Sequence, residues 1–303
     1  MKKLKILLAI PIILLGGGEI ALRIYGLCNA PLYQASDKYE YMACPNQEGS
    51  RFFNHYKYNS YSQRSDEPDS TKTIILGLGD SVIFGGVQTD QKDLATSIFT
   101  AETGMQMLNI SAGSWGPDNC VAYLKEKGLF GAKAMFLLVS SHDAHDNMDF
   151  QPVVGIHPSY PDKQYKLALW ELIDRYVMPR VFKKKNVEPD PDQKVAQGVG
   201  IKKGGRVFNP GFNELKAIAD SANIPLVVYL HADIEELRNG CYNEQGKEII
   251  DWAEKNCVTL IKELNYKFTE EDYRDGIHIN AKGQRKQAEI MKRVMPKYIK
   301  NNN

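Results

Sequence analysis

From residue 73 to the C-terminus, short apolar runs alternate with amphipathic stretches. Each apolar run has the length of an ordinary strand, so we expect five buried strands, at 73–78, 105–110, 134–140, 225–230 and 258–262. The amphipathic stretches predict helices at 118–129, 212–222, 244–256 and 281–300. Strands and helices that alternate in this way indicate a parallel sheet covered by helices on its faces.

Two segments lie outside this alternation. Residues 29–72 are polar, rich in Tyr, Asn and Ser, and lack helical periodicity, which predicts an irregular lead-in packed on the domain. Residues 150–210 hold one amphipathic helix, near 165–177, and too little apolar content for a core of their own. We therefore expect one domain, 73–303, with an insertion at about 150–210. Loops of this length are usually functional or disordered, and a substrate gate and a surface excursion both stay open.

The N-terminus combines a basic start with an apolar run. Lys2, Lys3 and Lys5 precede the apolar residues 6–15, which is the order found in secretory signals. A buried helix of the domain is the alternative. A full membrane span needs about 20 apolar residues, and Glu19 would then lie near the interface. We expect residues 1–28 to form an uncleaved signal anchor with the lysines inside. The body would then be extracytoplasmic, in the periplasm or at the cell surface.

The charge balance and the cysteines narrow the function classes. Lys and Arg number 38 against 37 Asp and Glu, for a net charge of +1, and neither sign forms a long block. Nothing in this charge pattern indicates a polyanion-binding protein, so we expect no nucleic-acid partner. The five cysteines leave at least one unpaired and have no zinc-type spacing. Cys241 and Cys257 flank a predicted helix, where a disulfide and two free thiols are both compatible with the sequence.

The first candidate for chemistry is Gly79-Asp80-Ser81, which follows the first predicted strand. Open α/β sheets bind their ligands at the carboxyl ends of the strands, which is where Ser81 would lie. The alternative is that Asp80 and Ser81 only cap a helix. Ile83 occupies the place of the second glycine in Gly-x-Ser-x-Gly, which disfavours the nucleophile elbow of α/β-hydrolases.

The second candidate is Asp275-Gly276-Ile277-His278, which precedes the last predicted helix. A turn at this spacing can bring the Asp275 carboxylate to the His278 imidazole, where it fixes the tautomer and stabilises the imidazolium. The alternative is a surface pair at the start of a helix. Taken together, the two motifs predict a catalytic triad in which Ser81 is the nucleophile, His278 the base and Asp275 its partner.

The two motifs together resemble those of the SGNH/GDSL hydrolases, over residues 73 to about 297 with the insertion left out. The resemblance implies a three-layer α/β/α sandwich with a five-stranded parallel sheet, a flavodoxin-like arrangement, and a triad that needs no cofactor and no metal. It also implies an oxyanion hole made by the amides of Ser81 and Gly113, with Ser114 as the choice if the motif is offset by one residue. His142 stands where the family has an asparagine donor, and Asn147 could substitute for it.

Other residues at these strand ends are candidate substrate contacts: Asp80, Ser114, Trp115, Asn147 and His231. A competing metal site is suggested by His142, Asp143, His145 and Asp146, which are metal-ligand residue types close together in the sequence. Their spacing matches no specific metal signature, so no metal is expected.

The resemblance implies a serine esterase, similar to O-acetylesterases, acting on acyl esters of cell-surface or exported polysaccharide. The expected partners are an acylated carbohydrate or another small ester, and the membrane through the N-terminal segment. Two alternatives stay open: an O-acyltransferase with the same triad, and a non-catalytic carbohydrate-binding or assembly protein that retains the fold. His142 stands where the family has an asparagine donor, and this substitution favours the non-catalytic alternative.

Overall fold

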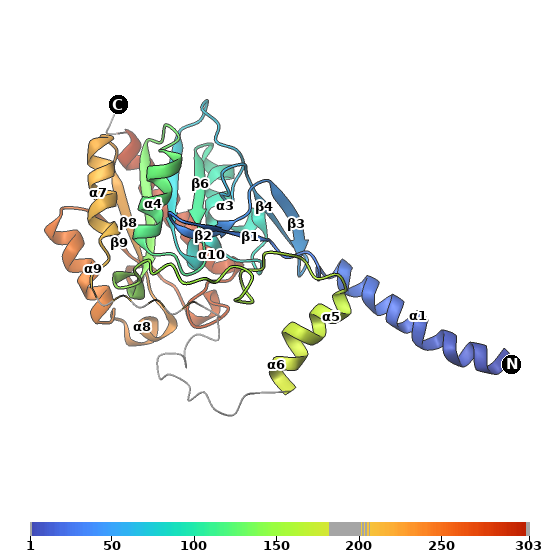
Figure 1. Cartoon of the computed structure of the whole chain (residues 1–303). Coiled ribbons are helices and arrows are strands. Elements are labelled where there is room, and N and C mark those ends of the chain that lie inside the picture. Colours follow the sequence, from blue (N-terminus) through green and yellow to red (C-terminus); the bar gives the residue numbers. More distant parts are fainter. Residues whose placement is uncertain (1, 182–200, 202, 204, 206, 301–303) are drawn as a thin grey trace.

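A computed structural model describes residues 2–181, 201, 203, 205 and 207–300 of the chain (Figure 1). Its centre is a five-stranded parallel sheet in the order β6-β5-β7-β8-β9. The strands are β5 (Ile74–Gly79), β6 (Gln106–Ser111), β7 (Ala134–Ser140), β8 (Leu226–His231) and β9 (Thr259–Lys262). Every residue of β5, β6, β7 and β8 is buried, as expected for strands covered on both faces. All five predicted strands are confirmed: β7 has the predicted ends, and no end of the other four is shifted by more than one residue.

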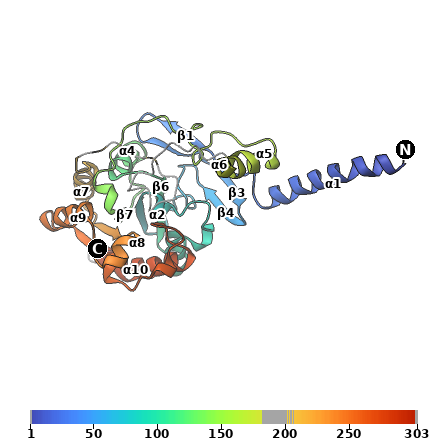
Figure 2. The same ribbon diagram turned by 90° about the horizontal axis from the view of Figure 1, so that it is seen from below.

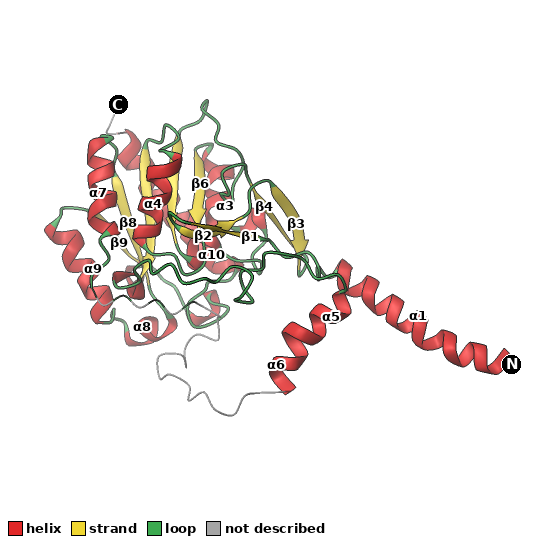
Figure 3. Ribbon diagram, viewed as in Figure 1, coloured by secondary structure: helices red, strands yellow, loops and turns green. Residues whose placement is uncertain are grey.

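Helices cover both faces of the sheet, as Figures 2 and 3 show. One face packs against α4 (Pro117–Lys127), α7 (Gly211–Ser221) and α9 (Glu244–Lys255). The other packs against α3 (Ala95–Thr103) and α10 (Ala281–Lys300). The first two strands of this sheet in chain order, β5 and β6, exchange places, so that β6 lies at the edge and β5 lies inside it. This is the flavodoxin-like order. The predicted three-layer α/β/α sandwich is therefore confirmed.

Several shorter elements join these layers. The helices α2 (Ser81–Phe84) and α8 (Ile234–Asn239) follow β5 and β8, and neither was predicted from the sequence. The remaining single turns are η1 (Gln91–Asp93), η2 (Ser141–Ala144), η5 (Glu263–Asn265) and η6 (Glu270–Asp272). The long helices had clear apolar periodicity, whereas elements of three to six residues are too short to show a period.

The lead-in is regular, contrary to the prediction. It forms two antiparallel hairpins, one of β1 (Tyr33–Ser36) with β2 (Glu40–Ala43) and one of β3 (Gln47–Arg51) with β4 (Asn54–Tyr58). Its tyrosines pack into the core beside α4, and they include Tyr33, Tyr39, Tyr41, Tyr56 and Tyr58. Tyrosine combines a large apolar ring with a polar hydroxyl, so a polar-looking stretch here contributes substantially to the core.

The insertion contributes one helical segment made of α5 (Ala168–Leu172), the π-helical turn η3 (Ile173–Val177) and α6 (Met178–Val181). The predicted helix at 165–177 thus starts later and extends further. Residues 182–200, the central part of the predicted insertion, lie outside the described residues. Lys203 returns to the body, where its ammonium is buried and contacts the Glu40 carboxylate at 2.7 Å.

The N-terminal helix α1 (Lys2–Ile24) projects away from the body, beside α5 (Figures 1 and 2). Over the part of the chain that the structure describes, no helix has the length and apolarity needed to cross a membrane. Glu19 has a structural partner: its carboxylate accepts the backbone N–H groups of Ala168 and Leu169, both at 2.9 Å, and so caps α5. All five cysteines are free, so Cys241 and Cys257 do not form a disulfide.

Candidate active site

Ser81 is the first residue of α2, directly after the carboxyl end of β5. Asp80 caps this helix, since its Oδ1 accepts the N–H of Val82 at 2.9 Å. Gly79 has a φ of 151°, and a Cβ there would lie 2.3 Å from the carbonyl oxygen of Leu138. Only glycine fits this turn, which carries the chain off the strand and leaves Ser81 half-buried at the edge of the sheet.

The second motif brings its histidine to this serine. His278 Nε2 lies 2.9 Å from Ser81 Oγ, and His278 Nδ1 lies 2.9 Å and 3.0 Å from the two carboxylate oxygens of Asp275. With a carboxylate at Nδ1, that nitrogen carries the proton, and Nε2 can accept one from the serine. Burial disfavours the charged form of Asp275, but the hydrogen bonds from His278 outweigh it and lower the pKa of Asp275 below its ordinary value. The carboxylate therefore stays ionised.

A buried ion pair holds the loop that carries His278. His231 is fully buried at the end of β8, with Nδ1 2.8 Å from Glu263 Oε2 and Nε2 2.7 Å from the carbonyl oxygen of Ile277. Both partners only accept hydrogen bonds, so both ring nitrogens must carry a proton. Burial lowers the pKa of His231, but the Glu263 carboxylate outweighs this effect and raises it to about 9. Two tyrosine hydroxyls, those of Tyr229 and Tyr273, also donate to Glu263.

His231 therefore acts on the site through the backbone of Ile277, the neighbour of His278, and its full burial leaves no surface for the substrate contact expected from the sequence. Arg274 provides a second support that sequence reasoning missed. Its guanidinium donates to the carbonyl of Gly85, at the end of α2, at 3.0 Å. It thereby ties the loop of the histidine to the helix of the serine.

The segment after β6 holds the expected amide donors. The hydroxyls of Tyr41 and Tyr160 both donate to the carbonyl oxygen of Gly113, at 2.8 Å and 2.9 Å. Because the peptide unit is planar, these two bonds also fix the direction of the next N–H, that of Ser114. Ser114 Oγ accepts the N–H of Ile201 at 3.0 Å. Trp115 is buried with its indole N–H on the Tyr41 carbonyl, so it lies out of reach of a substrate.

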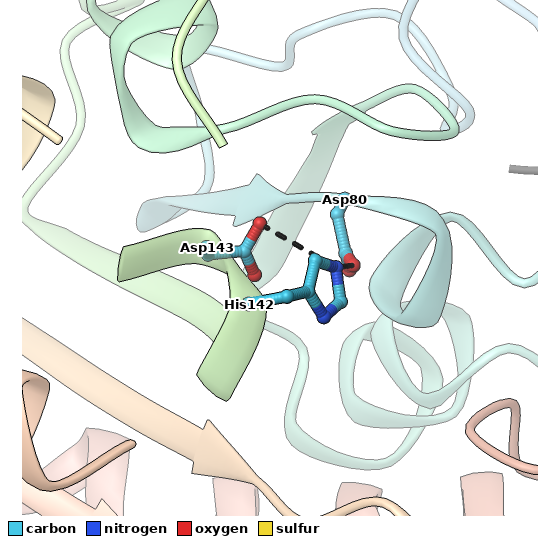
Figure 4. Close-up of side chains that lie close together, drawn as sticks. All are labelled: Asp80, His142 and Asp143. Carbon is cyan, nitrogen blue, oxygen red and sulfur yellow. Dashed lines mark ion pairs between the residues drawn. The ribbon is translucent and has the colours of Figure 1, made fainter. Parts of the chain in front are cut away.

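His142 lies among three carboxylates, and Figure 4 shows two of them, those of Asp80 and Asp143. Its Nε2 is 3.6 Å from Asp80 Oδ2, 3.9 Å from Asp143 Oδ1 and 3.8 Å from Asp146 Oδ2. Burial lowers the pKa of His142, but the three carboxylates outweigh this effect and raise it to about 10, so the ring is an imidazolium. Burial and the Asp80 charge raise the pKa of Asp143 well above its ordinary value. Ser81 thus directly follows Asp80, whose carboxylate lies 3.6 Å from the His142 ring.

The same cluster is the place where a metal ion could bind. Asp80, His142 and Asp143 offer ligand atoms that lie within 4.8 Å of one another. Within the described residues, Asp80 Oδ2 and Asp143 Oδ1 are buried without a hydrogen-bond partner. His145 does not join this group, because its Nε2 lies 3.0 Å from Glu248 on α9. His145 therefore does not join His142 in the competing metal site that the sequence left as an alternative.

Asn147 lies in a separate cleft of about 550 Å³, whose lining includes Asp118, Phe150 and Val207. Ser81, His142 and His278 do not line this cleft. In the orientation that satisfies its neighbours, the Asn147 amide donates to the carbonyl oxygens of His145 and Val207, each at 3.1 Å. Its N–H groups are therefore used within the fold, and Asn147 does not substitute for His142 as a donor.

No protein-family model and no curated protein matches the chain. Among solved structures it is similar to a member of the lipolytic protein G-D-S-L family from Veillonella parvula, with 11% identity and a TM-score of 0.42 over 74% of this chain and 98% of that one. It is also similar to a family 3 carbohydrate esterase from Clostridium thermocellum, with 12% identity and a TM-score of 0.39 over 76% and 98%. A third is the psychrotrophic esterase EstA from a Pseudoalteromonas species, with 13% identity and a TM-score of 0.40 over 77% and 100%. Similarity at this level carries no argument about chemistry, which rests on the side chains described above.

Proposed function

We propose that the chain is a serine esterase of the SGNH type. The observation that carries the proposal is the unbroken line of contacts from Ser81 Oγ through the His278 ring to the Asp275 carboxylate, with every distance between 2.9 and 3.0 Å. The flavodoxin-like strand order and the resemblance of the two motifs to SGNH/GDSL hydrolases support it. An activated nucleophile of this kind needs a base within hydrogen-bond reach and a third group that orients the base.

The chemistry is a double displacement. Ser81 Oγ attacks the ester carbonyl carbon while His278 Nε2 takes the hydroxyl proton, and the ionised Asp275 stabilises the imidazolium that forms. His278 then passes the proton to the leaving alcohol, which leaves an acyl group on Ser81. Water then attacks the acyl carbon and gives a proton to His278, which returns this proton to Ser81 Oγ as the bond to the acyl group breaks, so that the acid leaves and the free serine is restored. General acid–base catalysis of this kind contributes roughly 10²- to 10⁴-fold in rate.

Three donors are proposed for the oxyanion: the N–H of Ser81, a peptide N–H at Gly113 or Ser114, and His142. Ser81 is in the first turn of α2, where N–H groups have no acceptor within the helix. The tyrosine hydroxyls on the Gly113 carbonyl support a fixed orientation of that peptide. His142 would replace a neutral amide by a cation, and charge-assisted hydrogen bonds are about twice as strong as neutral ones.

For the substrate we propose an acylated carbohydrate of the cell surface, on the strength of the motif resemblance. An acyltransferase would use the same triad, with a sugar hydroxyl in the place of water. We also propose that the N-terminal segment attaches the chain to the membrane, with the body outside the cytoplasm. The support is the order of the sequence, in which Lys2, Lys3 and Lys5 precede an apolar run.

A fluorophosphonate probe tests the nucleophile. We expect the wild-type chain to be labelled at Ser81 and to hydrolyse a small acetyl ester, and Ser81→Ala to lose both. Ser221→Ala, at the exposed end of α7, is the matched control and should keep both. A folded wild-type chain that is neither labelled nor active would contradict the proposal and favour the non-catalytic carbohydrate-binding alternative.

A further inference from the structure

The large apolar side chains that face solvent gather at one end of the molecule. We call this group the apolar tip surface. Its members, each between 39% and 71% exposed, are Ile13, Leu14, Leu15, Ile20 and Ile24 of α1, Tyr25, Phe53 at the β3–β4 turn, and Leu167, Trp170, Ile173, Val177, Met178 and Val181 of the α5–α6 segment. Elsewhere in the described chain four such residues remain, Tyr61, Phe150, Ile156 and Val207, of which Phe150 and Val207 line the cleft of Asn147. A gathered patch of this kind marks an interaction site, whereas scattered residues do not.

The α5–α6 segment buries one acidic side chain against the body of the protein. Glu171 is 1% exposed, and its carboxylate contacts the guanidinium of buried Arg51 at 2.5 Å and accepts the N–H of Cys28 at 2.5 Å. Apolar residues on the other side recur at spacings of three and four, at Trp170, Ile173, Val177 and Val181, and face solvent. A helix that packs only against its own domain in water has the opposite arrangement. The buried ion pair therefore holds the apolar side outward.

The two helices of the surface meet at one junction. Glu19 caps α5 through two backbone N–H groups, and Arg23 donates to the carbonyl of Lys166 at 2.6 Å. A Cβ on Gly18 would lie 3.8 Å from the Leu169 side chain, so the two helices are in contact there. Figure 1 shows α1 projecting away from the body and the α5–α6 segment leaving the same junction in a different direction. The exposed apolar residues of both helices therefore flank one junction.

The basic and aromatic residues at the apolar tip surface indicate which kind of partner binds it. Lys163, Lys166 and Arg180 are exposed around the α5–α6 segment, and Arg23 is half-exposed at the junction. Trp and Tyr with a surrounding of Lys and Arg are the residues enriched where a protein meets the interface of a bilayer. Basic residues beside such a surface are attracted to anionic lipid headgroups. The acidic Asp162 and Asp174 are also exposed on this segment, and Asp174 is engaged by the Tyr165 hydroxyl.

We infer that the apolar tip surface docks on a lipid bilayer that carries anionic headgroups, with the α5–α6 segment lying against the lipid. This docking on the bilayer does not depend on the proposed esterase chemistry. It would give the inserted segment a function of its own. It also differs from an anchor formed by α1 alone, because α5 and α6 come from the middle of the chain.

Tryptophan fluorescence tests the inference with the full chain. Trp170 is 55% exposed, whereas Trp115 and Trp252 are 1% and 8% exposed. In vesicles of phosphatidylcholine and phosphatidylglycerol with brominated acyl chains, we expect quenching of the emission that Trp170→Phe lacks. If the Trp170 emission is not quenched while the chain floats with the vesicles, α1 binds alone and the inference is wrong. The inference would also be overturned if the Trp170 emission is already blue-shifted without lipid and light scattering gives twice the mass of one chain. The apolar tip surface would then bind a second copy of the chain.

A matched pair of valines separates docking from a general loss of structure. Val181 on α6 is 65% exposed, and Val207, near the start of α7, is 67% exposed. We expect Val181→Asp to reduce the quenching of Trp170 and Val207→Asp to leave it unchanged. Equal effects of the two substitutions would overturn the inference. Hydrolysis of a soluble ester should stay the same in both variants, so failure of this inference is distinguishable from failure of the proposed function.

Discussion

Replacing His231 by glutamine removes the buried cation that holds the loop of His278. The pKa of His231 is raised from 6.5 to about 9 in the folded chain. At about 1.4 kcal/mol per pH unit, this difference corresponds to about 3 kcal/mol of folding free energy. Because the folded-state pKa is the higher one, the stabilisation is fully present below pH 6.5 and is lost as the pH rises through about 9. Glutamine does not titrate, so its variant lacks this dependence.

The assay is urea unfolding of the wild type and of His231→Gln at several pH values from 6 to 10. We expect the difference in unfolding free energy to be largest near pH 6 and to shrink by about 3 kcal/mol by pH 10. His142 titrates in both proteins, so its contribution cancels in the difference. A part of the difference in unfolding free energy that does not depend on pH will remain at pH 10, because the buried Glu263 carboxylate has lost its histidine partner in the variant.

The control is His55→Gln, which removes a histidine that pairs with Glu48 at the surface, with its side chain 40% exposed. Solvent screens such a pair, so we expect a change of less than about 1 kcal/mol. A difference for His231→Gln that stays constant from pH 6 to 10 would refute the assignment of His231 as an imidazolium.

The remaining predictions concern the active site. Asp275→Asn should lower kcat/KM of ester hydrolysis by up to about 10⁴-fold, because the imidazole loses the partner that fixes its tautomer, while Asp251→Asn, exposed on α9, should not change it. His142→Ala should reduce kcat by about 10²- to 10³-fold with little effect on KM, and His142→Asn should recover most of the loss; equal rates for the two variants would exclude a donor role. Dialysis against a chelator should leave hydrolysis unchanged, whereas a loss that a divalent cation restores would assign the His142 cluster to a metal. Gly79→Ala should lower the melting temperature far more than Gly131→Ala, since both glycines have positive φ but only a Cβ at Gly79 meets a backbone oxygen, at 2.3 Å.

The layers of the fold could be predicted because their signals are local. Each central strand is a continuous apolar run, and each long helix has a repeat that shows in the sequence itself. The approach of Ser81 to His278 could be expected for the same reason. Each motif directly adjoins a recognisable element, and strand ends of a parallel sheet meet at one edge.

The supports of the site could not be predicted. Glu263 lies 32 residues from His231, and the other partner of that histidine is a backbone carbonyl, which no sequence pattern marks. Trp115 looked like a binding residue because it stands next to the glycines of the expected oxyanion segment. It is buried because the lead-in, which carries no periodic signal, folds over it and accepts its indole N–H at Tyr41. The burial of both residues follows from contacts between distant segments.

The distance along the chain between Ser81 and His278 sets the moment at which the site can exist. The two residues are 197 positions apart, and the loop of His278 precedes α10, which reaches back to α3 through a hydrogen bond between the side chain of Gln284 and the N–H of Ala95. At about 5–20 residues per second, a ribosome adds the base roughly 10–40 s after the nucleophile. A nascent chain can therefore complete most of its sheet while the proposed triad still lacks its base.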